Sequence, residues 1–464
     1  MRISTLACGL AAALLASSSA LAAPPKVDPV LHDKALEILK KSIGFRTVMG
    51  SDQFVPYAEY LKGELMAGGF KADEIVVEPF GGSAFLIARY PGKDPKKPPI
   101  VISGHMDVVE AKPEDWTRDP FTAVVENGYV YGRGASDNKF DVSTMVALLA
   151  KLRRDGWKPG RDVVLALSGD EETKMITTAE LARRLKGAEM VLNIDGGGGG
   201  LKDGKPTGYG VQGAEKTYAD YTITVTDPGG HSSRPTPSNP IYRLSRALDR
   251  LGAYQFPVMW NEITLASAAA RAPNLPEPIG SASKRFAENP RDEEAVRVLA
   301  ADLNINPSLR TTCVATMIQG GHAPNALPQR AMATVNCRIF PGVSSEAVRQ
   351  EIAKVLAEPT ATVTRVADDG SVDSPASPLR PDLMAAVKKA VHARYPGLPV
   401  APSQASGATD SMHFRAVGIP SYGVSGMFGE AGESFAHGLN EKAPLATLDG
   451  NLFHYESLLK DLAR

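Results

Sequence analysis

The sequence carries almost no net charge. It has 51 lysine and arginine residues against 52 aspartate and glutamate residues, a formal charge of −1 at pH 7. Proteins that bind nucleic acid or an anionic membrane surface through electrostatics usually have a clear positive excess. The near-zero net charge gives no electrostatic argument for either partner. We therefore expect the protein to bind neither nucleic acid nor a membrane.

Long apolar runs are missing beyond the first residues, so we expect a soluble mature protein. At the start of the chain, Arg2 precedes a short apolar run over residues 6–15, and A-L-A at 20–22 matches the pattern that signal peptidase accepts. Residues 1–22 therefore read as a signal peptide cleaved near Ala22 or Ala23. We expect a periplasmic or secreted protein.

Cysteine is scarce. Of the three cysteines, Cys8 lies in the expected signal peptide, which leaves Cys313 and Cys337. The segments around these two read as consecutive strands joined by a loop, and an oxidising compartment would allow one bridge between them. We expect two unpaired buried thiols, with one disulfide as the alternative.

The chain of 464 residues is 43% hydrophobic and long enough for two or three domains. Short apolar strands alternate with helices up to Asp195, and the pattern resumes from Pro378. This order predicts an α/β domain with a mostly parallel sheet and helices on both faces, built from residues 23–213 and 373–464. Residues 214–372 read as a smaller inserted α+β domain.

Two stretches have no such pattern. The glycine run at 196–200 lacks the residues of a phosphate-binding loop, so we interpret it as a flexible turn. Residues 257–309 are rich in proline and alanine, and we expect them to be irregular, with no role that the sequence reveals.

The chemistry is expected to centre on residues 99–107. Pro99 to Ile102 is a short apolar run typical of a buried strand, so His105 and Asp107 lie just past its carboxyl end. The two-residue spacing points both side chains the same way, which lets Asp107 fix the tautomer of a metal-binding His105. A loop histidine paired with an aspartate is the plainer alternative for this segment alone.

Polar residues recur at the ends of predicted strands of this sheet. Each alone has a simple explanation, because carboxylates favour helix starts and acidic loops are usually solvated. Together, at one end of one sheet, they offer the mixture of imidazole and carboxylate that zinc uses. The set is His105, Asp137, Glu171, Glu172, Asp195 and His437.

Four motifs resemble those of one enzyme family. They are G-H-M-D-V-V at 104–109, G-R-G-A-S-D-N-K at 132–139, S-G-D-E-E-T at 168–173 and A-H-G at 436–438. They resemble the co-catalytic zinc hydrolases that include glutamate carboxypeptidase, aminoacylase, yeast carboxypeptidase S and succinyl-diaminopimelate desuccinylase. The resemblance runs from about Ala35 to the C-terminus. It implies two Zn²⁺ per subunit, with Co²⁺ or Mn²⁺ as other divalent candidates.

The resemblance also implies which residue binds which metal. Asp137 would bridge the two ions. Glu172 and His437 would complete one site, and His105 and Asp195 the other.

Catalytic roles follow from the same resemblance. Asp107 would orient His105, and a cis peptide bond is expected between Asp137 and Asn138. Glu171 would stay free as the general base, so that metal-bound hydroxide attacks the substrate and the proton passes to the leaving amine.

The inserted domain and the last part of the chain contribute further candidates. His231, in G-G-H-S-S-R-P, resembles the family histidine that stabilises the oxyanion, in many members from the partner subunit; without the resemblance it reads as a surface residue. Asn325 and Arg338 match positions that bind the substrate carboxylate or carbonyl, and a guanidinium suits a carboxylate. Gly407 is the third substrate-binding candidate, although S-G-A-T-D departs from the family's G-G-T-D.

These residues predict an exported di-zinc hydrolase of an amide bond next to a free carboxylate. Dipeptides or short peptides are the preferred substrates, and N-acyl amino acids are the near alternative. A catalytically inactive peptide-binding protein is an alternative of another class. A homodimer through the inserted domain is a further expectation, unless the enlarged domain supplies His231 within one chain.

Overall fold

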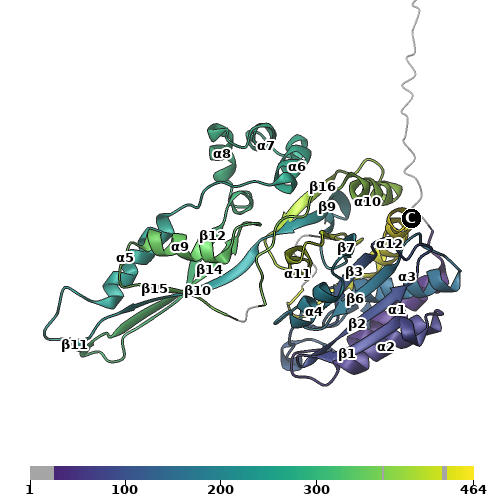
Figure 1. Ribbon diagram of the computed structural model, residues 1–464, viewed down its shortest axis with the longest axis horizontal. Helices are drawn as coiled ribbons and strands as arrows, with labels where there is room; N and C mark the ends of the chain where they lie inside the picture. Colours follow the sequence, from purple (N-terminus) through teal and green to yellow (C-terminus); the bar gives the residue numbers. More distant parts are fainter. Residues whose placement is uncertain (1–25, 368–369, 431–435) are drawn as a thin grey trace, which may run out of the picture.

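The computed structural model describes residues 26–367, 370–430 and 436–464. The predicted signal peptide lies outside these residues. Within them, we find no helix with the length and apolar character needed to cross a membrane. Figure 1 shows a compact α/β domain from which a second, elongated part of the chain extends.

The α/β domain is built on a ten-stranded sheet. Its central strands β6, β3, β7 and β17 are parallel, which confirms the predicted fold class, while β1 and β2 at one edge are antiparallel. The strands are β1 (Ile75–Phe80), β2 (Ser83–Tyr90), β3 (Ile100–His105), β6 (Val163–Ser168), β7 (Met190–Asn193), β8 (Gly198–Lys202), β9 (Lys205–Glu215), β16 (Val400–Ala405), β17 (Ser421–Gly423) and β18 (Phe428–Glu430).

Helices cover both faces of this sheet, which explains why its central strands β3, β6 and β7 are buried throughout. Ile100 and Ile102 of β3 pack into the core on one face, and Val101 packs into the core on the other. The first face carries α1 (Pro29–Ile43), α2 (Phe54–Ala67), α3 (Lys139–Arg154), α10 (Pro381–Arg394) and α12 (Leu448–Leu462). The second carries α4 (Ile176–Arg184) and α11 (Ser411–Ala416).

The glycine run is part of the sheet, so our interpretation of it as a flexible turn was wrong. Its last residues begin β8, which pairs with β9 and β18. A Cβ at Gly199 would lie 2.1 Å from a ring atom of Phe428. Glycine here therefore lets an aromatic ring pack directly on the strand.

A four-stranded antiparallel sheet forms the core of the elongated part. Its order is β12-β14-β10-β15, and α5 and α9 pack on it through a separate apolar cluster. The chain leaves the large sheet at Glu215 and enters the small one at Thr217. The elements are β10 (Thr217–Thr226), α5 (Pro240–Ala253), β12 (Thr312–Gly320), β14 (Arg330–Ile339), α9 (Ser345–Leu356) and β15 (Thr362–Arg365).

Residues 257–309 are helical, so the expectation of an irregular segment was wrong. They form α6 (Glu262–Arg271), α7 (Ile279–Glu288) and α8 (Glu293–Ala300), with 3₁₀ helices at Ala272–Asn274 and Asn306–Leu309. Phe286, Leu299 and Leu309 are among the buried side chains of a small core of their own. The prolines lie at the ends of these short helices, where they interrupt any long helical period but not the helices themselves.

Cys313 and Cys337 form a disulfide, which corrects the expectation of two free thiols. The two residues lie directly opposite each other on β12 and β14, with Cα atoms 4.1 Å apart. The pairing register of the two strands, which the sequence did not specify, therefore places the sulfur atoms together.

Smaller elements complete the chain. A three-stranded sheet contains β4, β5 and β19, and β11 and β13 pair as a separate ribbon. They are β4 (Val124–Glu126), β5 (Tyr129–Tyr131), β11 (Gly230–His231), β13 (Ala326–Leu327), β19 (Lys442–Pro444) and 3₁₀ helices at Ala72–Glu74, Pro113–Asp115 and Leu445–Thr447.

Candidate metal centre

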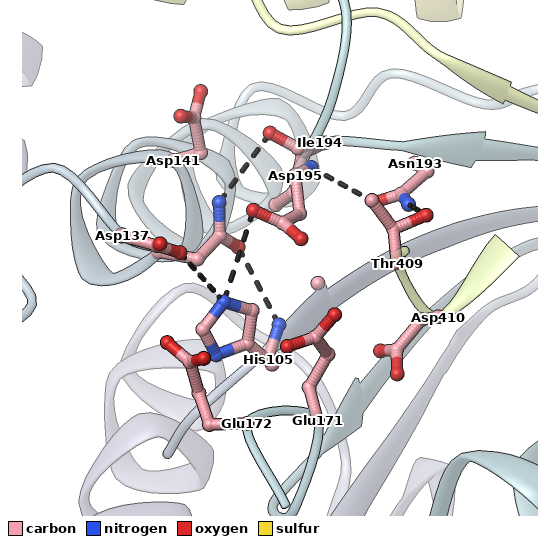
Figure 2. Close-up of polar contacts among 12 residues, drawn as sticks. His105, Asp137, Asp141, Glu171, Glu172, Asn193, Ile194, Asp195, Thr409 and Asp410 are labelled. Carbon is pink, nitrogen blue, oxygen red and sulfur yellow. Dashed lines mark hydrogen bonds and ion pairs between the residues drawn. The ribbon is translucent and has the colours of Figure 1, made fainter. Parts of the chain in front are cut away.

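His105 ends β3 and is fully buried. Its Nε2 lies 2.9 Å from Asp137 Oδ1 and 3.7 Å from Asp195 Oδ1 (Figure 2). On the other side of the ring, Nδ1 lies 3.1 Å from the main-chain oxygen of Asp107 and 3.4 Å from its carboxylate. Burial alone would lower the pKa of His105, but the carboxylates, Asp195 foremost, raise it well above its ordinary value. Asp107 thus turns Nε2 toward the acidic residues.

A second group forms around Asp137 on the side away from His105. His437 Nε2 lies 2.9 Å from Glu172 Oε1 and 3.4 Å from Asp137 Oδ2. Hydrogen bonds to these two carboxylates raise the pKa of His437 to about 10. Burial opposes ionisation of Asp137, but the two histidines hold its pKa below the ordinary value.

The structure brings all five predicted ligands together in two groups that share Asp137. Candidate ligand atoms of His105, Asp137 and Asp195 lie within 4.8 Å of one another, and so do those of Asp137, Glu172 and His437. Such imidazole and carboxylate donors suit zinc and similar divalent ions. Burial also raises the pKa of both Glu172 and Asp195, so their charged forms need a nearby positive charge. The residues fit a pair of divalent cations.

Glu171 lies beside these groups and is buried. Figure 2 shows its carboxylate directed toward Asp195 and His105, next to Glu172. Burial raises the pKa of Glu171 well above its ordinary value; the positive charge of His105 opposes this, and the charge of Asp195 adds to it. A buried carboxylate with a raised pKa beside such groups is a candidate general base.

Asp107 has a second role that the sequence did not reveal. Its Oδ1 accepts a hydrogen bond of 3.1 Å from the main-chain N–H of Glu171, and its Oδ2 one of 2.9 Å from that of Glu172. One carboxylate therefore fixes both His105 and the loop that carries the two glutamates.

Glu441 was missed by the sequence analysis. Its buried carboxylate accepts hydrogen bonds of 2.9, 2.8 and 3.0 Å from the main-chain N–H groups of Gly134, Ser136 and Asp137, and it pairs with Arg133 at 2.8 Å. It therefore holds the loop that presents Asp137. No local motif marks it, because its partners lie about three hundred positions earlier.

The peptide bond between Asp137 and Asn138 is cis, as the resemblance implied. The Asn138 side-chain oxygen accepts a hydrogen bond of 3.4 Å from the main-chain N–H of His105. This contact joins the Asp137 loop to the end of β3.

Asp410 is a second residue that the sequence analysis did not assign to the site. Figure 2 shows it beside Glu171. Its carboxylate accepts hydrogen bonds from the hydroxyls of Ser168, at 2.6 Å, and Thr178. Burial raises the pKa of Asp410 to about 7 against these hydrogen bonds, and its charge contributes to the raised pKa of Glu171.

Two of the predicted substrate-binding residues lie near each other. The Arg338 Nη1 donates a hydrogen bond of 3.2 Å to the main-chain oxygen of Ser406, and the guanidinium lies 4.8 Å from the centre of the Tyr218 ring. Gly407 follows directly, and a Cβ there would meet no atom within 4 Å. The structure thus brings Arg338 to an open backbone segment at Gly407.

The structure does not bring His231 and Asn325 to the metal centre of the same chain. His231 is exposed on β11, and Ser232 donates a main-chain hydrogen bond of 3.1 Å to Asn325. Figure 1 shows β11 at the end of the elongated part that is far from the large sheet. The hypothesis that the enlarged domain supplies His231 within one chain is therefore not supported by this arrangement.

Comparison with known proteins places the chain among enzymes with such centres. The model of peptidase family M20/M25/M40 matches residues 101–461. The chain is 27% identical over 448 residues to the N-fatty-acyl-amino acid synthase/hydrolase PM20D1 of Xenopus tropicalis, covering 92% of this chain and 85% of that protein. It is 29% identical over 271 residues to carboxypeptidase S of Saccharomyces cerevisiae, covering 55% of this chain and 47% of that protein.

A solved structure shares the fold. The M20 family metallo-carboxypeptidase Sso-CP2 from Sulfolobus solfataricus superposes with a TM-score of 0.69 at 20% identity, covering 92% of this chain and 99% of that one. The domain architecture described above is therefore one already seen in a metallo-carboxypeptidase.

Proposed function

Because the chain belongs to peptidase family M20/M25/M40 and is a metal-dependent hydrolase, we propose that it cleaves the amide bond next to a free carboxylate in dipeptides or short peptides. One observation supports this most strongly: Glu171 lies beside the two ligand groups that share Asp137, with a carboxylate oxygen within 4.8 Å of candidate ligand atoms of His105 and Glu172. A chain that only bound peptides would have no need of a buried carboxylate at this position, so we set that alternative aside.

The proposal assigns the metals to the residues described above. Asp137, Glu172 and His437 would hold one divalent ion, and Asp137, His105 and Asp195 the other. When bound, two such ions polarise a carbonyl and lower the pKa of a water molecule. Zinc is the first candidate, and Co²⁺ or Mn²⁺ are others.

The chain's own residues would move the proton. Glu171 would accept it from the attacking water and donate it to the nitrogen of the leaving amine. Burial raises its pKa above the ordinary value for a glutamate, which favours uptake of the proton. Asp107 keeps Glu171 in place through the main chain.

Arg338 and Gly407 would bind the end of the substrate that carries the free carboxylate. The Arg338 side chain already bonds the Ser406 carbonyl, so its remaining N–H groups can pair with a carboxylate beside the open backbone of Gly407.

We further propose a homodimer that involves the inserted domain. Strand β12 forms an edge of the four-stranded sheet, and Val314, Met317 and Ile318 on it are 61%, 59% and 62% exposed. Exposed apolar side chains on a sheet edge favour pairing with another chain. In such a dimer, His231 and Asn325 would contribute to the metal centre of the partner subunit. Light scattering on the purified protein tests this. We expect a dimer for the wild type and a monomer for Ile318→Lys.

Export is also a proposal. It is supported by the signal peptide that the sequence predicts and by the Cys313–Cys337 disulfide, which is typical of oxidising compartments. Fractionation of cells that express the protein, followed by N-terminal sequencing, tests it.

N-acyl amino acids are the second candidate substrates. The relative in Xenopus tropicalis is named an N-fatty-acyl-amino acid synthase/hydrolase, which favours this class. A panel of dipeptides and N-acyl amino acids with the same carboxyl-terminal residue separates the candidates. We expect turnover of the dipeptides; turnover of the N-acyl compounds alone would reject the peptidase proposal.

A further inference from the structure

A pocket of about 420 Å³ lies between the helices of residues 262–309 and strand β16. This volume is within the range of small-molecule sites. Most of its wall is apolar. The larger apolar side chains that line it are Leu275, Phe286, Leu299, Leu303, Ile305 and Leu309.

Helix α6 leaves this space because of its small side chains. Thr264, Ser267, Ala268 and Arg271 line the pocket, and their spacing of three and four residues puts them on one face of the helix. The first three have short side chains that leave the space open. The helix therefore forms one wall of the pocket without closing it.

The opposite end of the pocket is fixed to the junction of the two sheets. Lys216 lies between β9 and β10, lines the pocket and is fully buried. Its Nζ donates hydrogen bonds of 2.9 Å to the Pro307 carbonyl and 3.1 Å to the Thr312 hydroxyl. Burial lowers the pKa of Lys216 to about 7, and the charge of Arg338 acts in the same direction. Lys216 thus ties the 3₁₀ helix in the pocket wall to the chain junction.

The pocket reaches the segment where the carboxylate of the substrate is expected to bind. Ser406 lines it, and the carbonyl of Ser406 accepts the hydrogen bond from Arg338. Three residues later, Thr409 donates a hydrogen bond of 2.8 Å to Glu215 and precedes Asp410, which lies beside Glu171. A group attached to the same carbon as an Arg338-bound carboxylate would therefore lie close to Ser406 in the pocket wall.

Resting on the proposed function, we propose that this pocket binds a large apolar side chain of the substrate residue that carries the free carboxylate. The enzyme then prefers substrates that end in leucine or phenylalanine over those that end in glycine. The helices of residues 262–309, for which the sequence suggested no role, are specificity-determining.

The test uses Ala268→Leu, which fills the pocket, and Ala269→Leu as the matched control, because Ala269 is the exposed neighbour on the same helix and does not line the pocket. Values of kcat/KM are measured with Ala-X and N-acetyl-X substrates, where X is Gly, Ala, Leu or Phe. Ala268→Leu is expected to lower kcat/KM for Phe and Leu about tenfold or more, and for Gly less than about twofold. The control should match the wild type.

A second variant tests the pocket without a substitution in α6. Leu303 lines the pocket but is 88% exposed, so Leu303→Asp should leave thermal unfolding unchanged and lower kcat/KM for Phe more than for Gly. A third series keeps X as Phe and lengthens the acyl group from acetyl to dodecanoyl.

Equal losses for all X in both variants, or no loss in either, would overturn the inference. So would a loss in Ala268→Leu that grows with acyl length instead of with the size of X, since the pocket would then hold the acyl chain. Failure of the wild type to hydrolyse any compound of the panel would instead contradict the proposed function.

Discussion

The carboxylate of Glu441 accepts a hydrogen bond of 3.0 Å from the main-chain N–H of Asp137, although the two residues lie 304 positions apart. Asp137 is the residue shared by both ligand groups. Glu441 also balances the buried charge of Arg133, whose Nη1 lies 2.8 Å from it. The last part of the chain therefore positions a candidate ligand that the first part supplies.

Glu441→Gln should weaken both folding and metal binding. It leaves Arg133 buried without a charged partner, and breaking a buried pair costs about 3 kcal/mol or more. Denaturant unfolding and metal analysis of the purified variant measure the two effects. Glu456→Gln, which removes an exposed pair with Lys460, is the control and should change the free energy of unfolding by less than about 1 kcal/mol. A Glu441→Gln protein with wild-type stability and metal content would show that Glu441 does not hold the loop.

Substitution of Glu171 and substitution of Glu172 should have different effects, although the two residues are adjacent. Glu171→Gln keeps the five proposed ligands, so we expect full metal content and a kcat about 10²- to 10⁴-fold lower. Glu172→Gln removes a candidate ligand and should lower the metal content itself. Metal analysis and steady-state kinetics on both variants check this. If Glu171→Gln retained wild-type kcat, Glu171 would not be the base.

The sequence predicted the parts of the site that are local. The segment around His105 and Asp107 showed a buried strand, although β3 continues to His105, which we expected just past its end. The resemblance supplied the other ligands. Glu441 and Asp410 were missed because their roles depend on contacts across hundreds of residues. The disulfide depended on the register of β12 and β14, which no short motif specifies.

Stability should fall with acidity because of His454. Burial, with the nearby charge of Arg394, lowers the pKa of its fully buried ring to about 3. In the unfolded chain the pKa is about 6.5, so below that value the unfolded state binds a proton that the folded state does not. His454 alone should therefore lower the free energy of unfolding by about 1.4 kcal/mol per pH unit as the pH falls from about 6.5 toward 3.

The measurement is the free energy of unfolding against pH for the wild type and His454→Asn. The variant should lose this slope, although its stability at pH 7 will be lower because Tyr209 loses the partner that lies 3.1 Å away. His322→Asn, at an exposed position, is the control. An unchanged slope in His454→Asn would exclude His454 as its source.

Reduction of the Cys313–Cys337 disulfide should destabilise the four-stranded sheet that contains β12 and β14. The bond closes a loop with a sequence separation of 24 residues, which in the chain-entropy description contributes about 3.5 kcal/mol. Unfolding of the oxidised protein, the reduced protein and the double Cys313→Ala, Cys337→Ala variant measures it. Identical midpoints for oxidised and reduced protein would show that the bond does not form or does not stabilise this sheet.

The central claim is that the two ligand groups that share Asp137 hold two metal ions. The number of ions bound per chain tests it most directly. Protein stripped with a chelator is titrated with Zn²⁺, bound metal is counted, and activity is followed in parallel. We predict about two ions per chain, recovery of activity with the metal, and loss of high-affinity binding at both sites in Asp137→Asn, since both groups share that carboxylate. An active chain that binds no metal, or an Asp137→Asn variant that still binds two ions with wild-type affinity, would contradict the account.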